Sequence, residues 1–166
     1  MELNLLIDTN VVVDSFLERE PFLSMSRRAI SLSRQYPNVR NFISASTVTD
    51  IYYITYRALK NRQIVRGLFI NLFEFVRVVT VTDKDIHDAF ALNWKDFEDS
   101  VQYSVAKSNR FDGIVTRNMQ GFADDEVKIF TPEECSAEIL RELYKSLPDE
   151  IRKSNDVGTV ITVPAA

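Results

Sequence analysis

The chain has 166 residues, 45% of them hydrophobic, and a formal net charge of −4. This size and composition are typical of a single soluble globular domain, and the negative charge argues against a protein that holds nucleic acid by bulk charge alone. With four glycines, one cysteine and one histidine, the sequence contains no Gly-rich phosphate-binding motif, no cysteine-based zinc cluster and little scope for histidine chemistry.

Strands and helices are predicted to alternate along the chain. Strands are expected at residues 2–8, 39–44, 77–81, 113–116 and 127–130, and helices at 11–17, 21–35, from 46 onward, 62–75, 82–94, 96–109 and from 131 onward. Asn10 and Ser46 are the expected N-caps of the first and third helices. Short apolar strands alternating with helices predict an α/β fold, with three α/β/α layers around a central parallel sheet.

The main domain is expected to span residues 1–147, and the tail 148–166 breaks the alternation. This tail is an added strand, a swapped arm or a disordered end. Asp8 ends the first apolar run too early for a secretory signal, and Glu74 and Arg77 interrupt the most apolar later stretch. A cytoplasmic protein without membrane contact is therefore the expectation.

Four acidic residues occupy positions that a parallel sheet brings to one edge. Asp8 ends the first strand, Asp50 falls in the first turns of the helix after the second strand, and Asp96 and Asp99 begin the helix before the fourth strand. Helix N-termini meet the carboxyl ends of the strands, where open α/β sheets bind ligands. Oxygen ligands without sulfur or imidazole suit Mg²⁺ or Mn²⁺, so the pattern predicts a metal-dependent nuclease.

Each of these acids also has a structural alternative. Asp96 is a natural N-cap with Asp99 as its capping-box partner, and Asp50 has Tyr53 within reach of a hydrogen bond. Asp8 is the hardest to explain this way, because a carboxylate that ends a central strand is costly unless it is hydrated, paired or metal-bound.

The apolar pattern of the helix before the fourth strand predicts the direction in which its acids point. Asp99 stands about 200° around the helix from Val101, away from the apolar stripe that includes Phe97, so Asp99 is not expected in the core. Asp14 and Glu98 are expected on solvated surfaces or as supporting residues of the site.

Four segments resemble the motifs of a PIN domain, the fold of many metal-dependent ribonucleases, including VapC-type toxins. They are Leu6–Asn10, Ser46–Asp50, Asp96–Gln102 and Ile114–Asn118, and the resemblance covers roughly residues 1–132. The resemblance implies a parallel sheet of order 3-2-1-4-5, a Mg²⁺ or Mn²⁺ site, and cleavage of RNA by an activated water.

The resemblance also implies roles for individual residues. Asp8, Asp50 and Asp99 become the catalytic metal ligands, with Asp96 as an assisting ligand or a cap only; Thr9 and Asn10 tie down the loop of Asp8, and Thr116 and Asn118 support the site.

Two departures from the family pattern concern the charge of the site. The acid on the third helix is often glutamate, so Asp50 has a shorter reach. A fourth acid often follows the fourth strand, where this chain has Asn118 and then Gly121. A weak site or a site for one metal ion is therefore expected.

Arginines and apolar helix residues suggest partners. Arg27, Arg28, Arg62 and Arg117 are candidates to position RNA phosphates, with solvated helix surface as the alternative. The apolar residues of 62–75 exceed one core stripe, which is typical of a dimer face or an antitoxin groove, with a deeply packed helix as the alternative.

The sequence therefore predicts a PIN-type endoribonuclease, the toxin of a type II toxin–antitoxin pair, acting on RNA as a homodimer with an antitoxin partner. Metal-dependent phosphoryl chemistry on DNA or a small phosphoester is one alternative. A catalytically inactive PIN-fold module that binds RNA or protein is the other.

Overall fold

The computed structural model describes residues 2–122 and 126–146 of the chain, so the tail 148–166 lies outside the described residues. The elements follow in chain order as β1 (Leu3–Ile7), α1 (Thr9–Phe16), α2 (Leu23–Gln35), β2 (Val39–Ser44), α3 (Ala45–Leu59), α4 (Arg62–Phe73), β3 (Val76–Val79), α5 (Asp83–Leu92), α6 (Phe97–Ser108), β4 (Gly113–Val115), the short 3₁₀ helix η1 (Met119–Gly121), β5 (Ile129–Phe130) and α7 (Pro132–Ser146).

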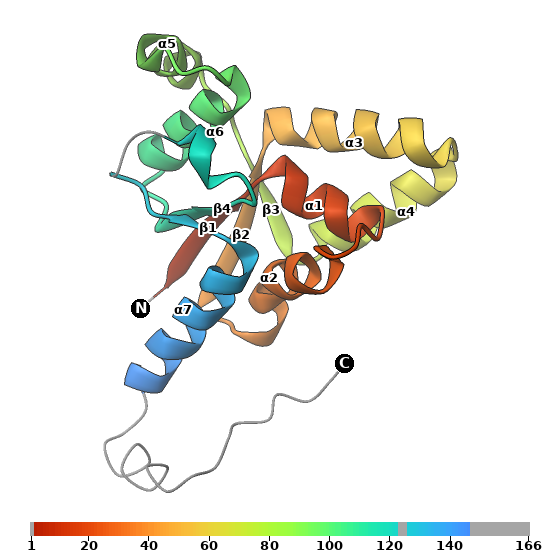
Figure 1. Cartoon of the computed structure of the whole chain (residues 1–166), viewed down its shortest axis with the longest axis horizontal. Helices are drawn as coiled ribbons and strands as arrows, with labels where there is room; N and C mark the ends of the chain where they lie inside the picture. The colour runs from red at the N-terminus through yellow and green to blue at the C-terminus, as the bar shows by residue number, and fades with distance from the viewer. Residues whose placement is uncertain (1, 123–125, 147–166) are drawn as a thin grey trace, which may run out of the picture. The chain divides into compact units, whose positions relative to one another are not determined.

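The five strands form one parallel sheet in the order β3-β2-β1-β4-β5, which confirms the predicted fold class and strand order. Helices α1 to α4 lie on one side of the sheet and α5 and α6 on the other (Figure 1). The direction of strand addition reverses between β1 and β4, which are neighbours although more than 100 residues separate them in the chain. In open α/β sheets, such a switch point is where ligands bind.

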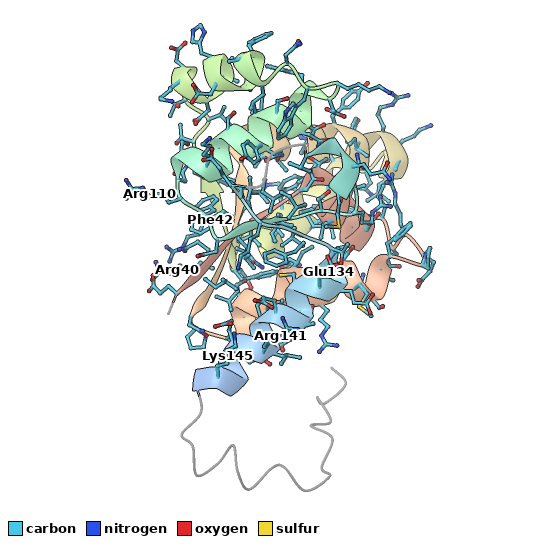
Figure 2. The ribbon with its side chains drawn as sticks, turned by 60° about the vertical axis from the view of Figure 1, so that its left-hand side comes forward. Arg40, Phe42, Arg110, Glu134, Arg141 and Lys145 are labelled. Atoms are coloured by element: carbon cyan, nitrogen blue, oxygen red, sulfur yellow. The ribbon has the colours of Figure 1, made fainter. Side chains whose placement is uncertain are left out.

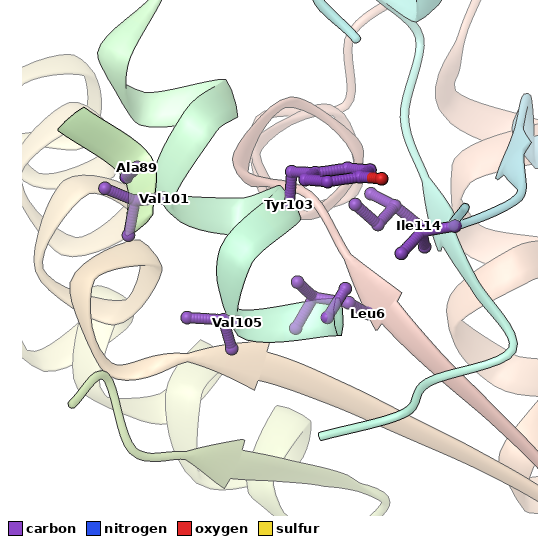
Figure 3. Close-up of a cluster of buried hydrophobic side chains, with 8 residues drawn as sticks. Leu6, Ala89, Val101, Tyr103, Val105 and Ile114 are labelled. Atoms are coloured by element: carbon purple, nitrogen blue, oxygen red, sulfur yellow. The ribbon is translucent and has the colours of Figure 1, made fainter. Parts of the chain in front are cut away.

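The core between the sheet and helices α5 and α6 is built from apolar side chains with almost no exposed surface. Leu6 from β1 and Ile114 from β4 pack with Val101, Tyr103 and Val105 of α6 (Figure 3). Because the strands are covered on both faces, Leu5, Leu6 and Ile7 are all 0% exposed, and this is why the first strand is an unbroken apolar run.

Two predicted helix caps are wrong, and both helices begin earlier than expected. Asp8 caps α1 in place of Asn10, with its carboxylate accepting a hydrogen bond from the backbone N–H of Thr9. Ser44, the last residue of β2, caps α3 in place of Ser46 by accepting from the N–H of Thr47 at 3.1 Å. Each helix therefore starts directly at the end of a strand, with no connecting loop between them.

The chain divides into two compact units, Met1–Ser136 and Ala137–Ala166, and the whole sheet with helices α1 to α6 belongs to the first. The expected domain boundary near residue 147 stays a prediction. Among the described residues, no helix is both long and apolar enough to cross a lipid bilayer.

Replacing Leu6 with Ala is expected to lower the free energy of unfolding by about 2–5 kcal/mol, because it leaves a cavity between β1 and α6. Urea unfolding followed by circular dichroism measures this change. Ile70→Ala is the matched control, since Ile70 is 49% exposed on α4 and its loss is expected to change the stability little. Equal losses in the two variants would contradict the described core.

Candidate active site

Asp8 is a buried carboxylate held in one orientation by three hydrogen bonds. It is 4% exposed and stands where β1 ends and α1 begins. Its Oδ1 accepts from the N–H of Thr9 at 2.6 Å, and its Oδ2 accepts from Asn10 Nδ2 at 2.5 Å and from Thr116 Oγ1 at 2.7 Å. These donors come from α1 and from the end of β4, so Asp8 joins the two elements at the switch point of the sheet.

The loop after β4 is fixed to the start of α1 by the same residues. Asn10 Nδ2 also donates to Thr116 Oγ1 at 3.1 Å, and Asn10 Oδ1 accepts from the backbone N–H of Arg117 at 3.1 Å. The N–H of Asn118 donates to Thr116 Oγ1 at 3.0 Å. Thr9, Asn10 and Thr116 are thus brought together around Asp8, and Asn118 is joined to them through Thr116; the supporting roles of these four residues stay predictions.

Helix α6 contributes the other acids. Asp96 caps the helix, its Oδ1 accepting from the N–H groups of Glu98 and Asp99 at 2.9 and 3.4 Å. Asp99 is 7% exposed, and among the described residues its Oδ2 is buried without a hydrogen-bond partner. The expectation that Asp99 lies outside the core is wrong, and Phe97 of the supposed apolar stripe is 42% exposed. Nearly the whole circumference of α6 is buried, so a single apolar stripe does not describe it.

Gly121 makes room for the Asp99 carboxylate. A Cβ atom at residue 121 would lie 1.8 Å from Asp99 Oδ2 and 3.5 Å from Asn118 Nδ2. Any side chain there would displace the carboxylate, so the missing side chain of Gly121 lets the loop after β4 close over Asp99. The same contacts place the Asn118 amide next to Asp99.

The site is electrostatically strained by like charges. Burial, together with repulsion from Glu98 and Asp96, raises the pKa of Asp8 to about 6, although hydrogen bonds from Thr116 and Thr9 oppose this shift. Burial and repulsion from Asp8, Asp96 and Glu98 raise the pKa of Asp99 to about 7. A bound cation would relieve this repulsion, because it favours the charged form of each carboxylate.

Glu98 is more central to the site than the sequence analysis expected. Its Oε1 accepts a hydrogen bond from Thr9 Oγ1 at 2.6 Å, and its charge acts on both Asp8 and Asp99. Burial raises the pKa of Glu98, and the charge of Asp50 raises it further. The position of Glu98 between the helix cap and Asp99 was the feature of the sequence that could have indicated this role.

Asp50 lies on α3, and burial raises its pKa. Its charge acts on Glu98, but it is not among the charges that shift the pKa of Asp8 or Asp99. In the part of the chain that the structure describes, Asp50 forms no hydrogen bond with Tyr53. The role of Asp50 as a metal ligand stays a prediction.

The site fits a hard divalent cation in its donor chemistry and charge. Carboxylate oxygens gather at one edge of the sheet, and Asp99 Oδ2 is a buried acceptor without a partner among the described residues. As the described side chains stand, however, no group of three or more His, Cys, Asp or Glu residues is arranged to hold a metal ion. Binding by three carboxylates therefore requires side-chain rearrangement.

Asp14 and Arg117 form a buried ion pair beside the site. Asp14 is 0% exposed, so the solvated surface that was one of its two expected settings is wrong, and its Oδ2 lies 2.6 Å from Arg117 Nε. Burial raises the pKa of Asp14, while the guanidinium of Arg117 acts in the opposite direction. Arg117 also stacks at 4.1 Å over the ring of Phe22. This arginine therefore anchors the loop after β4 to α1, and its contact with RNA stays a prediction.

The other candidate RNA-binding arginines lie on helices α2 and α4. Arg27 and Arg28 are exposed on α2, where Arg27 pairs with Glu18 at 2.7 Å. Asp50 lies in the N-terminal half of α3, whereas Arg62 begins α4, which follows the C-terminal end of α3 (Figure 1). Among the described residues, no ion pair joins these arginines to Asp8, Asp50, Asp96 or Asp99, and their contact with RNA stays a prediction.

Comparisons with known proteins identify a family model and solved structures that share this fold. A family model described as PIN domain matches residues 4–120. A toxin–antitoxin complex from Klebsiella pneumoniae is similar at 21% identity and a TM-score of 0.58, covering 77% of this chain and 97% of that chain. VapC20 of Mycobacterium tuberculosis, a toxin that cleaves the sarcin-ricin loop, is similar at 16% identity and a TM-score of 0.55, covering 74% and 90%.

VapBC2 from Rickettsia felis, bound to a DNA fragment of its promoter, is similar at 13% identity and a TM-score of 0.63, covering 78% of this chain and 98% of that chain. At these identities the similarity shows a shared fold. No match was found among curated proteins.

Asp99→Asn is expected to stabilise the metal-free protein at pH 8 by about 1 kcal/mol or more, because it removes a buried charge. Folding raises the pKa of Asp99 from 3.8 to about 7, so the folded state holds more protons than the unfolded state between these values. The Asp99 contribution to stability therefore falls as pH rises through this window, and the gain from Asp99→Asn shrinks toward pH 5.

Urea unfolding at pH 5 and pH 8 in EDTA measures this difference. Asp88→Asn is the control, because Asp88 is a half-exposed residue on α5 that pairs with Lys84. A less stable Asp99→Asn protein at pH 8 would contradict the electrostatic strain described above.

Proposed function

Because the chain belongs to the PIN domain family, we propose that it is a divalent-metal-dependent endoribonuclease that hydrolyses RNA phosphodiester bonds. The observation that carries this proposal is the pair of buried carboxylates, Asp8 and Asp99, at the switch point of the sheet, where burial and then the charges of Asp8, Asp96 and Glu98 raise the pKa of Asp99. Perturbed acids at a ligand-binding edge mark a functional site more often than a structural one.

Asp8, Asp50 and Asp99 would hold Mg²⁺ or Mn²⁺, with Asp96 assisting as a ligand or acting only as the cap of α6. When bound, such an ion lowers the pKa of a water and stabilises charge on the leaving oxygen. A water that attacks in line with the leaving oxygen would produce a 5′-phosphate and a 3′-hydroxyl end.

The protein's own residues would orient the site. Thr9, Asn10 and Thr116 hold both oxygens of Asp8, so this carboxylate needs little reorganisation. Asn118 lies next to Asp99, and its neutral amide is able to donate a hydrogen bond to a water or a phosphate oxygen.

We further propose that the protein is the toxin of a type II toxin–antitoxin pair, with an antitoxin partner, and that it forms a homodimer. The structural similarity to a toxin–antitoxin complex and to VapC20 supports the toxin role. A stripe on α3, made of Tyr52, Tyr56 and Leu59, is 37–44% exposed, and Ile64 on α4 is 52% exposed. Exposed apolar residues at helical spacing are typical of a protein–protein interface, so we place the homodimer contact here.

One observation favours a second candidate, a PIN-fold module that binds RNA or protein without cleaving it. No three carboxylates of the described residues are arranged to share an ion, and Asn118 supplies no charge where the family often has an acid. Metal binding and RNA cleavage by the purified protein distinguish the two candidates.

Asp8→Asn and Asp99→Asn are each expected to reduce Mn²⁺-dependent cleavage of a labelled RNA by roughly 100-fold or more, because each removes a charged ligand. Gel electrophoresis of the RNA measures the rate, and circular dichroism checks that both variants fold. EDTA is expected to abolish cleavage by the wild-type protein.

Asp88→Asn is the matched control and is expected to leave cleavage unchanged, because Asp88 is a half-exposed residue on α5 that pairs with Lys84. Undiminished cleavage by Asp8→Asn or Asp99→Asn would sink the assignment of these ligands. A wild-type protein that binds RNA without cleaving it would favour the second candidate.

We expect the homodimer to dissociate when glutamate replaces exposed apolar residues of the stripe on α3 and of the start of α4. Light scattering after gel filtration is expected to give a dimer for the wild-type protein and a monomer for Tyr56→Glu/Ile64→Glu. Phe90→Glu is the control, because Phe90 is 66% exposed on α5, away from the stripe. A monomeric wild-type protein at micromolar concentration would argue against this interface.

A further inference from the structure

The acids of the candidate site come from two helix layers on opposite sides of the sheet (Figure 1). Asp50 lies on α3, which packs mainly on α1 and α4, and Asp99 lies on α6, which packs mainly on α5 and β4. These packing partners do not by themselves fix α3 against α6. A site that uses acids of both helices therefore needs a contact between the two layers at the carboxyl edge of the sheet.

A hydrogen bond between two fully buried side chains supplies such a contact. Gln102 of α6 and Thr47 of α3 are both 0% exposed, and Gln102 Nε2 donates to Thr47 Oγ1. Gln102 follows Asp99 by one turn of α6, and Thr47 precedes Asp50 by one turn of α3. Because residues three apart on a helix share a face, with about 5–6 Å between their Cβ atoms, each acid is a neighbour of one end of this bond.

The end of β2 holds the Thr47 hydroxyl in place. Ser44 is 0% exposed, and its Oγ accepts from the N–H of Thr47 at 3.1 Å and lies 2.9 Å from Thr47 Oγ1. Phe42, two residues before Ser44 on the same face of β2, packs against the core under α5 and α6 (Figure 2). The bond from Gln102 therefore joins α6 to a point that is fixed on the sheet as well as on α3.

Stability alone does not explain this polar pair. Replacing both partners of a buried hydrogen bond with apolar groups of the same shape is often neutral or stabilising. Gln102 Oε1 is, in addition, a buried acceptor without a hydrogen-bond partner among the described residues, which is a further cost. A hydrogen bond is directional, however, so it fixes the position of α3 relative to α6 more narrowly than apolar contact does.

We propose that the hydrogen bond between Gln102 and Thr47 is a positioning contact for the divalent-cation site. It holds α3 against α6 so that Asp50 and the acids of α6 reach one ion by rotation of their side chains, without movement of the helices. The charge of Asp50 acts on Glu98 of α6, which agrees with this placement. The positioning role rests on the proposed function, because it concerns the ion that these acids would hold.

Calorimetric titration with Mn²⁺ compares three variants with the wild-type protein. Thr47→Val removes the hydroxyl at nearly constant shape and is expected to weaken Mn²⁺ binding by about tenfold or more, because residues that orient metal ligands have effects of this size. Thr47→Ser keeps the hydroxyl and is expected to keep the affinity. Thr55→Val is the matched control and is expected to have no effect, because Thr55 is also 0% exposed on α3 but its hydroxyl has no hydrogen-bond partner among the described residues.

RNA cleavage separates positioning from substrate binding. For Thr47→Val, the rate at low Mn²⁺ concentration is expected to fall, and excess Mn²⁺ is expected to restore it. The KM for RNA is expected to stay unchanged, because Thr47 has no exposed surface with which to contact RNA. A changed KM for RNA together with an unchanged affinity for Mn²⁺ would overturn the positioning role.

Two further measurements keep the test valid if Thr47→Val does not fold. Thr47→Val/Gln102→Met removes both partners of the bond and is expected to be as stable in urea as the wild-type protein, yet to bind Mn²⁺ about tenfold more weakly. In the wild-type protein in EDTA, nuclear magnetic resonance is expected to show slow solvent exchange of the Gln102 side-chain amide protons. Rapid exchange in the folded protein would mean that the bond is not maintained and would overturn the positioning role.

Failure of the positioning role and failure of the proposed function give different results. If the wild-type protein and Thr47→Val bind Mn²⁺ equally well, the positioning role is overturned and the proposed metal site is not. If Thr47→Ser or Thr55→Val weakens binding as much as Thr47→Val does, the effect is one of packing, and the positioning role is again overturned. A wild-type protein that binds no Mn²⁺ overturns the proposed function and the positioning role together.

Discussion

The burial of carboxylates close to other acids, at the end of β1 and the start of α6, is the constraint on which the site depends. Asp8 and Asp99 are 4% and 7% exposed, and their pKa values are raised first by burial and then by the charges of neighbouring acids. Hydrogen bonds from Thr9, Asn10 and Thr116 compensate this cost only for Asp8. In the function proposed above, a divalent cation bound by these carboxylates would recover the stability that their burial costs.

The topology of the sheet brings the buried acids to the switch point between β1 and β4. Because strand addition reverses between β1 and β4, the loop after β4 comes to lie against α1 and α6, and Gly121 lets it close over Asp99. A buried hydrogen bond from Gln102 of α6 to Thr47 of α3 links the helices that carry Asp99 and Asp50.

Much of the fold follows from local sequence patterns, because apolar runs mark β1 and β4 and polar capping residues mark the starts of α5 and α6. The caps of α1 and α3 were each predicted two residues too late. The strand order follows from the family resemblance, and the structure confirms it. The burial of Asp99 and the pairing of Asp14 with Arg117 depend on contacts between segments far apart in the chain, which helical spacing does not describe. Glu98 was undervalued for the same reason, since its importance comes from the hydroxyl of Thr9 on another element.

The most direct measurement is a crystal structure of the protein grown with Mn²⁺, with the ion located by its anomalous scattering. We predict one peak bonded to carboxylate oxygens of both Asp8 and Asp99, with side chains moved from their metal-free positions to enclose the ion. Crystals that hold millimolar Mn²⁺ but show no peak within bonding distance of these two residues would contradict the proposed metal site.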